Sequence, residues 1–149
     1  MNKNIIPVNL QKVFILGGNS KIILTNPITE NFLIFRIKIS KDNNNLFFVS
    51  FKNGSGFYEY LGIINNEVFK ITVNSKFKAD SPQVKGFSFI WDKIISNKEI
   101  TEVIISHDKK CPVCNKALLT DKNIEIGFHE YCFKKVTGFA FNKYTSISD

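Results

Sequence analysis

The pattern that most constrains this chain lies near its C-terminal end and contains all of its cysteines. Cys111 and Cys114 form a C-x2-C pair, and fourteen intervening residues separate it from an H-x2-C pair, His129 and Cys132. Three thiolates and an imidazole suit the ligand preference of Zn²⁺, and two pairs at this spacing can fold around one tetrahedral ion. The sequence therefore predicts one structural Zn²⁺, bound by these four residues in a small zinc knuckle.

Local features of the two pairs support this prediction. Pro112 stiffens the first turn, and Asn115 tolerates the left-handed backbone that such a turn often needs. His129 and Cys132 share one face if a short helix begins near Glu130. The alternative is a set of buried free cysteines, because a thiol packs as a small hydrophobe. The odd number of cysteines and an N-terminus unlike a secretory signal disfavour disulfides, so we expect a reducing bacterial cytoplasm.

Length and composition limit the remaining possibilities. A chain of 149 residues that is 44% hydrophobic and contains 15 phenylalanines can form one ordinary core, with or without a metal-held appendage. Its apolar runs are too short and too often interrupted to predict a membrane span. The formal net charge of +7 favours polyanionic partners such as nucleic acid, although base composition alone can also enrich lysine.

The first hundred residues predict a strand-rich unit closed by one helix. Apolar or alternating segments, separated by turn residues, occur at residues 13–16, 21–25, 32–40, 46–51, 57–64, 68–73 and 101–105. Ser81 is a favoured N-cap, Pro82 suits the first helical position, and apolar residues recur at helical spacing as far as Ile95. We therefore expect an α+β fold, in which an antiparallel sheet of five to seven strands is covered by one main helix.

The order of these segments also predicts an organisation into parts. Residues 1–106 would form the strand-rich domain, and residues 107–138 would form the zinc-binding module with its short C-terminal helix. No long linker separates the two, so we expect the module to dock on the sheet. Residues 139–149 would form a frayed tail, unless Phe139, Phe141 and Tyr144 pack back onto the body.

No set of residues predicts catalysis. All three cysteines are assigned to the metal, both histidines lie beside it, and a closed Cys-rich site leaves no open position for a water molecule. Glu130 is more typical of a solvated charge at a helix start than of a catalytic base. We expect neither an enzyme nor a small-molecule substrate.

A nucleic-acid surface has more support in the sequence. Arg36 and Lys38 alternate on one strand, Tyr58 and Tyr60 alternate on another, and a sheet that presents cations and aromatic rings can follow a phosphate backbone and stack bases. A second basic group, Lys134 and Lys135, follows the last cysteine. The alternative is that both tyrosines pack under the helix and that the lysines only solubilise the chain.

The metal-binding end reads Cys111-x-x-Cys114-Asn-Lys-x-Leu118-x-Thr120-Asp-x-x-Ile124-x-x-Gly127-Phe-x-x-x-Cys132. This pattern resembles a family of small phage and plasmid proteins, whose end reads Cys-x-x-Cys-Gly-Lys/Arg-x-Leu-Thr-Asp/Asn-Pro-x-Ser-Ile and then Gly-Ile-Gly-Pro-x-Cys. The similarity extends upstream over residues 35–95. The chain departs from the family by an extra residue before Thr120, by the lack of Pro-x-Ser, and by His129 in place of the second glycine. The resemblance implies a mobile-element origin and a metal, but no particular activity.

The resemblance also leaves two histidines competing for the fourth ligand position. Relatives without a residue like His129 often carry a histidine just before the first cysteine, and His107 matches that spacing. Geometry favours His129, because a turn and a helix start converge on one ion. We thus expect a non-enzymatic phage or mobile-element protein that binds nucleic acid. The alternative is a zinc-stabilised module that inhibits a host protein complex, such as a bacterial defence or transcription complex, with Tyr58 or Phe128 as an exposed anchor.

Overall fold

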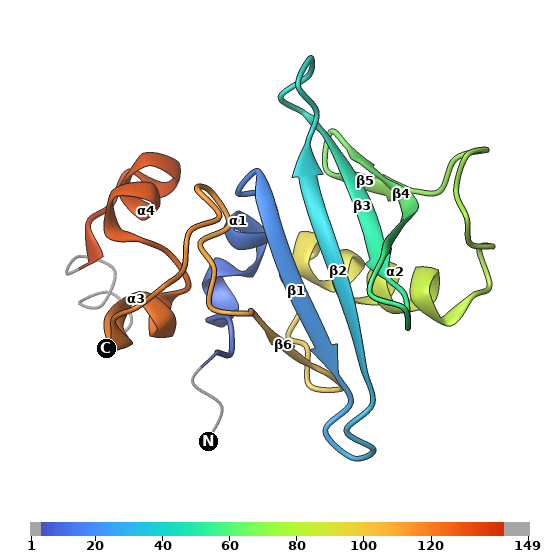
Figure 1. The fold of residues 1–149 in the computed structure, drawn as a ribbon, viewed down its shortest axis with the longest axis horizontal. Helices are drawn as coiled ribbons and strands as arrows, with labels where there is room; N and C mark the ends of the chain where they lie inside the picture. Colours follow the sequence, from blue (N-terminus) through green and yellow to red (C-terminus); the bar gives the residue numbers. More distant parts are fainter. Residues whose placement is uncertain (1–3, 142–149) are drawn as a thin grey trace.

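An antiparallel sheet of six strands forms the centre of the molecule (Figure 1). The structure, a computed structural model, describes residues 4–141. The spatial order of the strands is β5-β4-β3-β2-β1-β6. Their bounds are β1 Asn19–Thr25, β2 Phe32–Ile39, β3 Leu46–Lys52, β4 Tyr58–Asn65, β5 Val68–Lys70 and β6 Ile104–Ser106. The helices are the 3₁₀ helix η1 Val8–Leu10 and the α-helices α1 Gln11–Ile15, α2 Pro82–Ile95, α3 Asp121–Ile126 and α4 Glu130–Thr137.

The sheet confirms the predicted α+β class. Strands β1 to β5 form a meander in which each strand pairs antiparallel with the next, and β6 returns after α2 to pair with β1. Two strands are displaced from the prediction: the segment 68–73 is extended only over Val68–Lys70, and the last strand is Ile104–Ser106. A β-bulge between Val49 and Ser50 shifts the register of β3 against β4.

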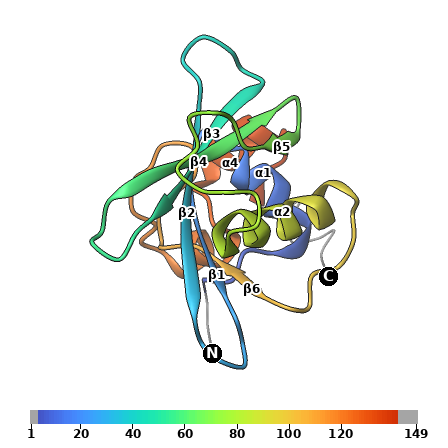
Figure 2. The same ribbon diagram turned by 90° about the vertical axis from the view of Figure 1, so that its right-hand side faces the viewer.

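Helix α2 covers one face of the sheet, as the sequence predicts. The Ser81 hydroxyl accepts a hydrogen bond from the Val84 N–H at 3.3 Å, and Pro82 occupies the first turn. The Phe87 ring meets Phe35 of β2 at a centroid distance of 5.3 Å and Phe69 of β5 at 4.8 Å. Figure 2 shows α1 and α2 on the same side of the sheet, so the main core lies between these helices and the sheet.

The segment 13–16 is not a strand, which corrects the sequence prediction. Residues 11–15 form α1, which places Leu10 and Phe14 one turn apart in the core. A short apolar run has no periodicity that separates a buried strand from a buried helix, and here tertiary packing decides. The helix is fixed to β1 by the Ser20 hydroxyl, which donates to the Ile15 carbonyl at 2.9 Å.

A row of aromatic rings joins α1 to the C-terminal segment. Phe14 meets Phe128 at 5.6 Å, Phe128 meets Phe133 at 5.6 Å, and Phe133 meets Phe141 at 5.3 Å. All four rings are buried. Phe139 is exposed, and Tyr144 lies outside the described residues. The hydrophobic core is thus continuous across residue 106, where the sequence predicts a domain boundary.

Within the described part of the chain, no helix is both long enough and apolar enough to cross a membrane.

Candidate metal centre and open sheet face

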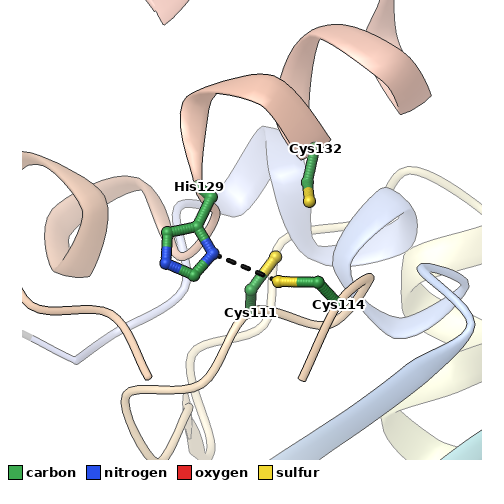
Figure 3. Close-up of side chains that lie close together, drawn as sticks. All are labelled: Cys111, Cys114, His129 and Cys132. Carbon is green, nitrogen blue, oxygen red and sulfur yellow. Dashed lines mark hydrogen bonds between the residues drawn. The ribbon is translucent and has the colours of Figure 1, made fainter. Parts of the chain in front are cut away.

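Cys111, Cys114, His129 and Cys132 converge in space, as Figure 3 shows. One sulfur or ring nitrogen from each residue lies within 4.8 Å of all the others. With Zn–S bonds of about 2.3 Å and Zn–N bonds of about 2.0 Å, tetrahedral ligand atoms lie roughly 3.5–3.8 Å apart. The four side chains therefore need shifts of about 1 Å or less to close around a metal ion of this size.

The orientation of His129 suits a metal ligand. Its Nε2 lies 3.0 Å from the Ala117 carbonyl, which can only accept, so Nε2 carries the proton. Its Nδ1 faces the sulfurs and lies 3.2 Å from the Sγ of Cys114 (Figure 3). A backbone carbonyl that fixes the outer nitrogen is the usual partner of a ligating histidine.

Two residues with left-handed backbone conformations bring the two ligand pairs together. Asn115 adopts a left-handed φ of 61° and donates its N–H to the Cys111 carbonyl, which closes the C-x2-C turn. Gly127 adopts a φ of 91° and ends α3, so that the chain reverses before His129 caps α4. An added Cβ at Gly127 would lie 3.1 Å from the Phe14 ring, so the glycine is also needed for close packing.

The pKa values of two thiols in the cluster are shifted in opposite directions. At Cys114, burial acts to raise the pKa, but the hydrogen bond from the Lys116 N–H and the polar contact with the His129 ring outweigh it and lower the pKa to about 7. At Cys132, burial and the nearby sulfur of Cys111 raise the pKa to about 12. A negative charge on one thiolate of this cluster therefore opposes the ionisation of a second thiol. A bound divalent cation would compensate this repulsion between the thiolates.

His107, the competing fourth ligand, lies outside the cluster. Its ring is buried, its Nδ1 accepts from the Lys109 N–H at 2.9 Å, and its Nε2 donates to the Ile124 carbonyl at 2.8 Å. The ring also stacks on Phe14 with a centroid distance of 5.8 Å. Both nitrogens are thus engaged, and His107 links α3 to α1 and to the end of β6.

The face of the sheet opposite α2, which we call the open face, carries the predicted cations and tyrosines. Pairing places Lys21, Arg36, Ser50 and Tyr60 in one row across strands β1 to β4. The Arg36 guanidinium lies over the Tyr58 ring at 4.2 Å, which shows that these side chains share the face away from Phe35 and α2. Tyr58 and Tyr60 therefore do not pack under the helix.

Additional cations gather on this face that sequence reasoning did not identify. Burial lowers the pKa of Lys21, Asp108 opposes this, and the nearby charges of Lys110, Lys52 and Arg36 lower it further. Lys21 also forms a loose ion pair of 3.9 Å with Asp108. These lysines are distant in sequence, and only the strand register reveals that they are neighbours.

The other predicted binding residues lie elsewhere. Lys134 and Lys135 are in the last turn of α4, which Figure 1 shows beside the sheet rather than on its open face. Phe128 is fully buried, so the prediction that it is an exposed anchor is wrong. Among the described residues after Ser106, the most exposed large apolar side chains are Leu119 and Tyr131, at 84% and 78% exposure.

Comparison with protein families, with curated proteins and with solved structures finds no match for this chain. The resemblance to phage and plasmid proteins stays a prediction.

Proposed function

We propose that this chain is a non-enzymatic protein of a phage or related mobile element, acting in the bacterial cytoplasm, that binds nucleic acid through its open sheet face. One structural Zn²⁺, held by Cys111, Cys114, His129 and Cys132 in a C-terminal knuckle, organises the part of the chain beside that face. The mobile-element origin is supported by the sequence resemblance alone. The binding function is supported by the composition of the open face.

The observation that carries the proposal is that the described strands present cations and aromatic rings on the open face and no carboxylate; the two carboxylates near this face, Asp42 and Asp108, come from the adjoining loops. The strands, all within the described residues, place lysine, arginine, tyrosine, phenylalanine, serine and aliphatic side chains on that face, whereas Glu59 pairs with Phe51 on the α2 side. A surface of this composition attracts a phosphate backbone and offers rings for base stacking.

The metal centre contributes to this face through the segment that enters it. Asp108 and Lys110 directly precede Cys111 and lie near Lys21 of β1. The Pro112 carbonyl accepts the Asn19 N–H at 2.8 Å, which attaches the C-x2-C turn to the start of β1. A metal that orders this turn would therefore fix Lys110 beside the sheet cations.

A structural rather than catalytic role is supported by the ligand set. Four protein ligands close a tetrahedral Zn²⁺, whereas a catalytic zinc keeps one position open. Glu130 is exposed at the first residue of α4, where a negative charge favours the helix dipole. We expect Glu130→Gln to leave metal content and partner binding unchanged; loss of either would argue for a role in the site.

The test of nucleic-acid binding is the fluorescence anisotropy of labelled DNA and RNA oligonucleotides at two salt concentrations. The double variant Arg36→Glu/Lys38→Glu should weaken binding to all sequences and flatten its salt dependence, because phosphate contacts carry affinity without base identity. The control Lys85→Glu/Lys98→Glu makes the same change of charge on and just after α2, and it should bind like the parent. Equal binding by both double variants would overturn the assignment.

The alternative function is docking on a host protein complex, and one observation favours it. Tyr131 is exposed and lines a shallow groove beside the metal centre with Val113 and Lys135. Under this alternative, Tyr131→Ala would abolish capture of a stoichiometric host protein, whereas the charge reversals on the sheet would have little effect. The Lys134→Glu/Lys135→Glu variant tests whether α4 adds to either surface.

A further inference from the structure

The open face contains a hollow of about 410 Å³ at the end where β2 leads into the β2–β3 loop. This volume is near the lower end of the range for ligand sites, roughly 300–1,000 Å³. Its lining includes three cations, one aromatic ring, two hydroxyls and one carboxylate: Arg36, Lys38, Lys41, Phe48, Ser40, Ser50 and Asp42. The hollow is thus the place on the face where phosphate-binding and base-binding groups meet.

The aromatic ring of the hollow is both accessible and held in place. Phe48 is 41% exposed although it lies in the middle of β3, where it pairs with Lys38. Its ring makes an edge contact with Tyr60 at 6.5 Å, and the Tyr60 hydroxyl hydrogen-bonds Thr72 at 2.9 Å. An exposed phenylalanine among cations cannot bind phosphate, but it offers a flat surface to a ligand that is both anionic and aromatic.

We infer that the hollow receives one unpaired nucleotide of a single-stranded nucleic acid. The base lies against Phe48, and the flanking phosphates lie near Lys38, Lys41 and Arg36. Ser50 can donate to or accept from the base edge, and the Asp42 carboxylate can accept from a base amino group. This inference rests on the proposed function and specifies its ligand.

A duplex fits the same surface less well. Its bases are stacked within the helix, so that it presents phosphates and groove edges but no free base face to Phe48. A duplex would therefore use only the cations of the open face. Single strands use both the cations and the ring, and this difference separates the two classes of ligand.

The test compares a single-stranded oligonucleotide with a duplex of the same length and sequence, both labelled, at one salt concentration. The parent protein should bind the single strand at least tenfold more tightly. Phe48→Leu keeps an apolar side chain but removes the ring, and it should weaken single-strand binding by roughly tenfold or more while leaving duplex binding unchanged. Phe89→Leu is the control, because Phe89 is 37% exposed but lies on α2, on the opposite side of the sheet.

The outcomes separate this inference from the proposed function. Equal affinity for single strand and duplex, or equal binding by the Phe48→Leu and Phe89→Leu variants, would overturn the inference. Salt-dependent binding of either form that is lost in Arg36→Glu/Lys38→Glu would still support the proposed function. Binding of neither form would overturn both. Thermal unfolding of each variant, followed through the single tryptophan, Trp91, identifies any that fail to fold.

Discussion

The sheet with α2 and the C-terminal part from residue 107 are stabilised in different ways. The first contains long paired strands and a core of large apolar side chains between α2 and the sheet. The second contains α3 with 6 residues and α4 with 8 residues, and helices of this length are marginal without tertiary support. Its support comes from the aromatic row that begins at Phe14 and from the four convergent ligands. We therefore predict that a metal ion bound by these four residues stabilises the C-terminal part more than it stabilises the sheet.

Metal removal should give the largest effect, and it tests directly whether the C-terminal part is stabilised by metal while the sheet is not. Structural Zn²⁺ contributes an apparent 10–16 kcal/mol or so in small zinc units, because binding and folding are coupled. We expect a chelator to remove hydrogen-exchange protection from α3 and α4 while β1 to β4 stay protected. The purified protein should contain one equivalent of zinc by elemental analysis. Well under one equivalent, or uniform loss of protection, would contradict the comparison.

The two histidines should separate metal binding from packing. His129→Ala removes the nitrogen that faces the sulfurs and should greatly reduce zinc retention. His107→Ala should retain zinc but lower the free energy of unfolding by about 1–3 kcal/mol, because it leaves the partly buried Ile124 carbonyl without its donor. Competition with a colorimetric chelator and denaturant unfolding measure the two quantities. The reverse ranking of zinc retention would assign the site to His107.

The junction between the two regions can be tested at Phe14. Phe14→Ala removes a fully buried ring that contacts both His107 and Phe128, and such truncations cost about 3–5 kcal/mol. Phe35→Ala is the matched control, because Phe35 is equally buried but contacts Phe87 of α2. Both should lower global stability. Only Phe14→Ala should also speed hydrogen exchange in α3 and α4, and equal exchange in the two variants would show that the aromatic row does not couple the regions.

These two regions also differ in how well the sequence predicts them. Residues 35–40 alternate between apolar and polar side chains, and turns that contain Asn and Gly separate the apolar segments that follow as far as residue 64, so the existence of these strands is readable from local signals. The pattern of Cys111, Cys114 and Cys132 is readable from spacing. The segment 13–16 is not, because four apolar residues do not show a period.

The open face illustrates a different limit. The alternation of Arg36 with Lys38 is visible in the sequence, but their proximity to Lys21, Lys52 and Lys110 depends on strand order and register. Phe48 lies in an apolar run, Leu46 to Phe51, where alternation does not show which residues face away from the core. The choice of His129 over His107 likewise depends on the Ala117 carbonyl, which only the folded chain places beside the ring.

The smallest expected effect is a pH dependence of stability that originates at His107. Burial lowers the pKa of this ring and Lys109 lowers it further, whereas the Ile124 carbonyl and Asp108 partly oppose the shift. The unfolded chain therefore binds more protons than the folded chain as the pH falls below about 6.5. The stabilising contribution is present above pH 6.5 or so, and it is lost progressively as the pH falls toward the lower pKa of the folded state.

The measurement compares the parent with His107→Gln, whose amide can still donate to Ile124 but does not titrate. Both are unfolded by denaturant at several pH values between about 5.5 and 7.5 with saturating zinc, so that titration of the metal ligands cancels in the difference. The stability of the parent should fall more steeply toward low pH. Nuclear magnetic resonance titration should give His107 a pKa below the ordinary value, and assignment is simple because the chain has 2 histidines. Parallel curves of stability against pH would show that protonation of the His107 ring does not weaken the contact between the sheet with α2 and the C-terminal part.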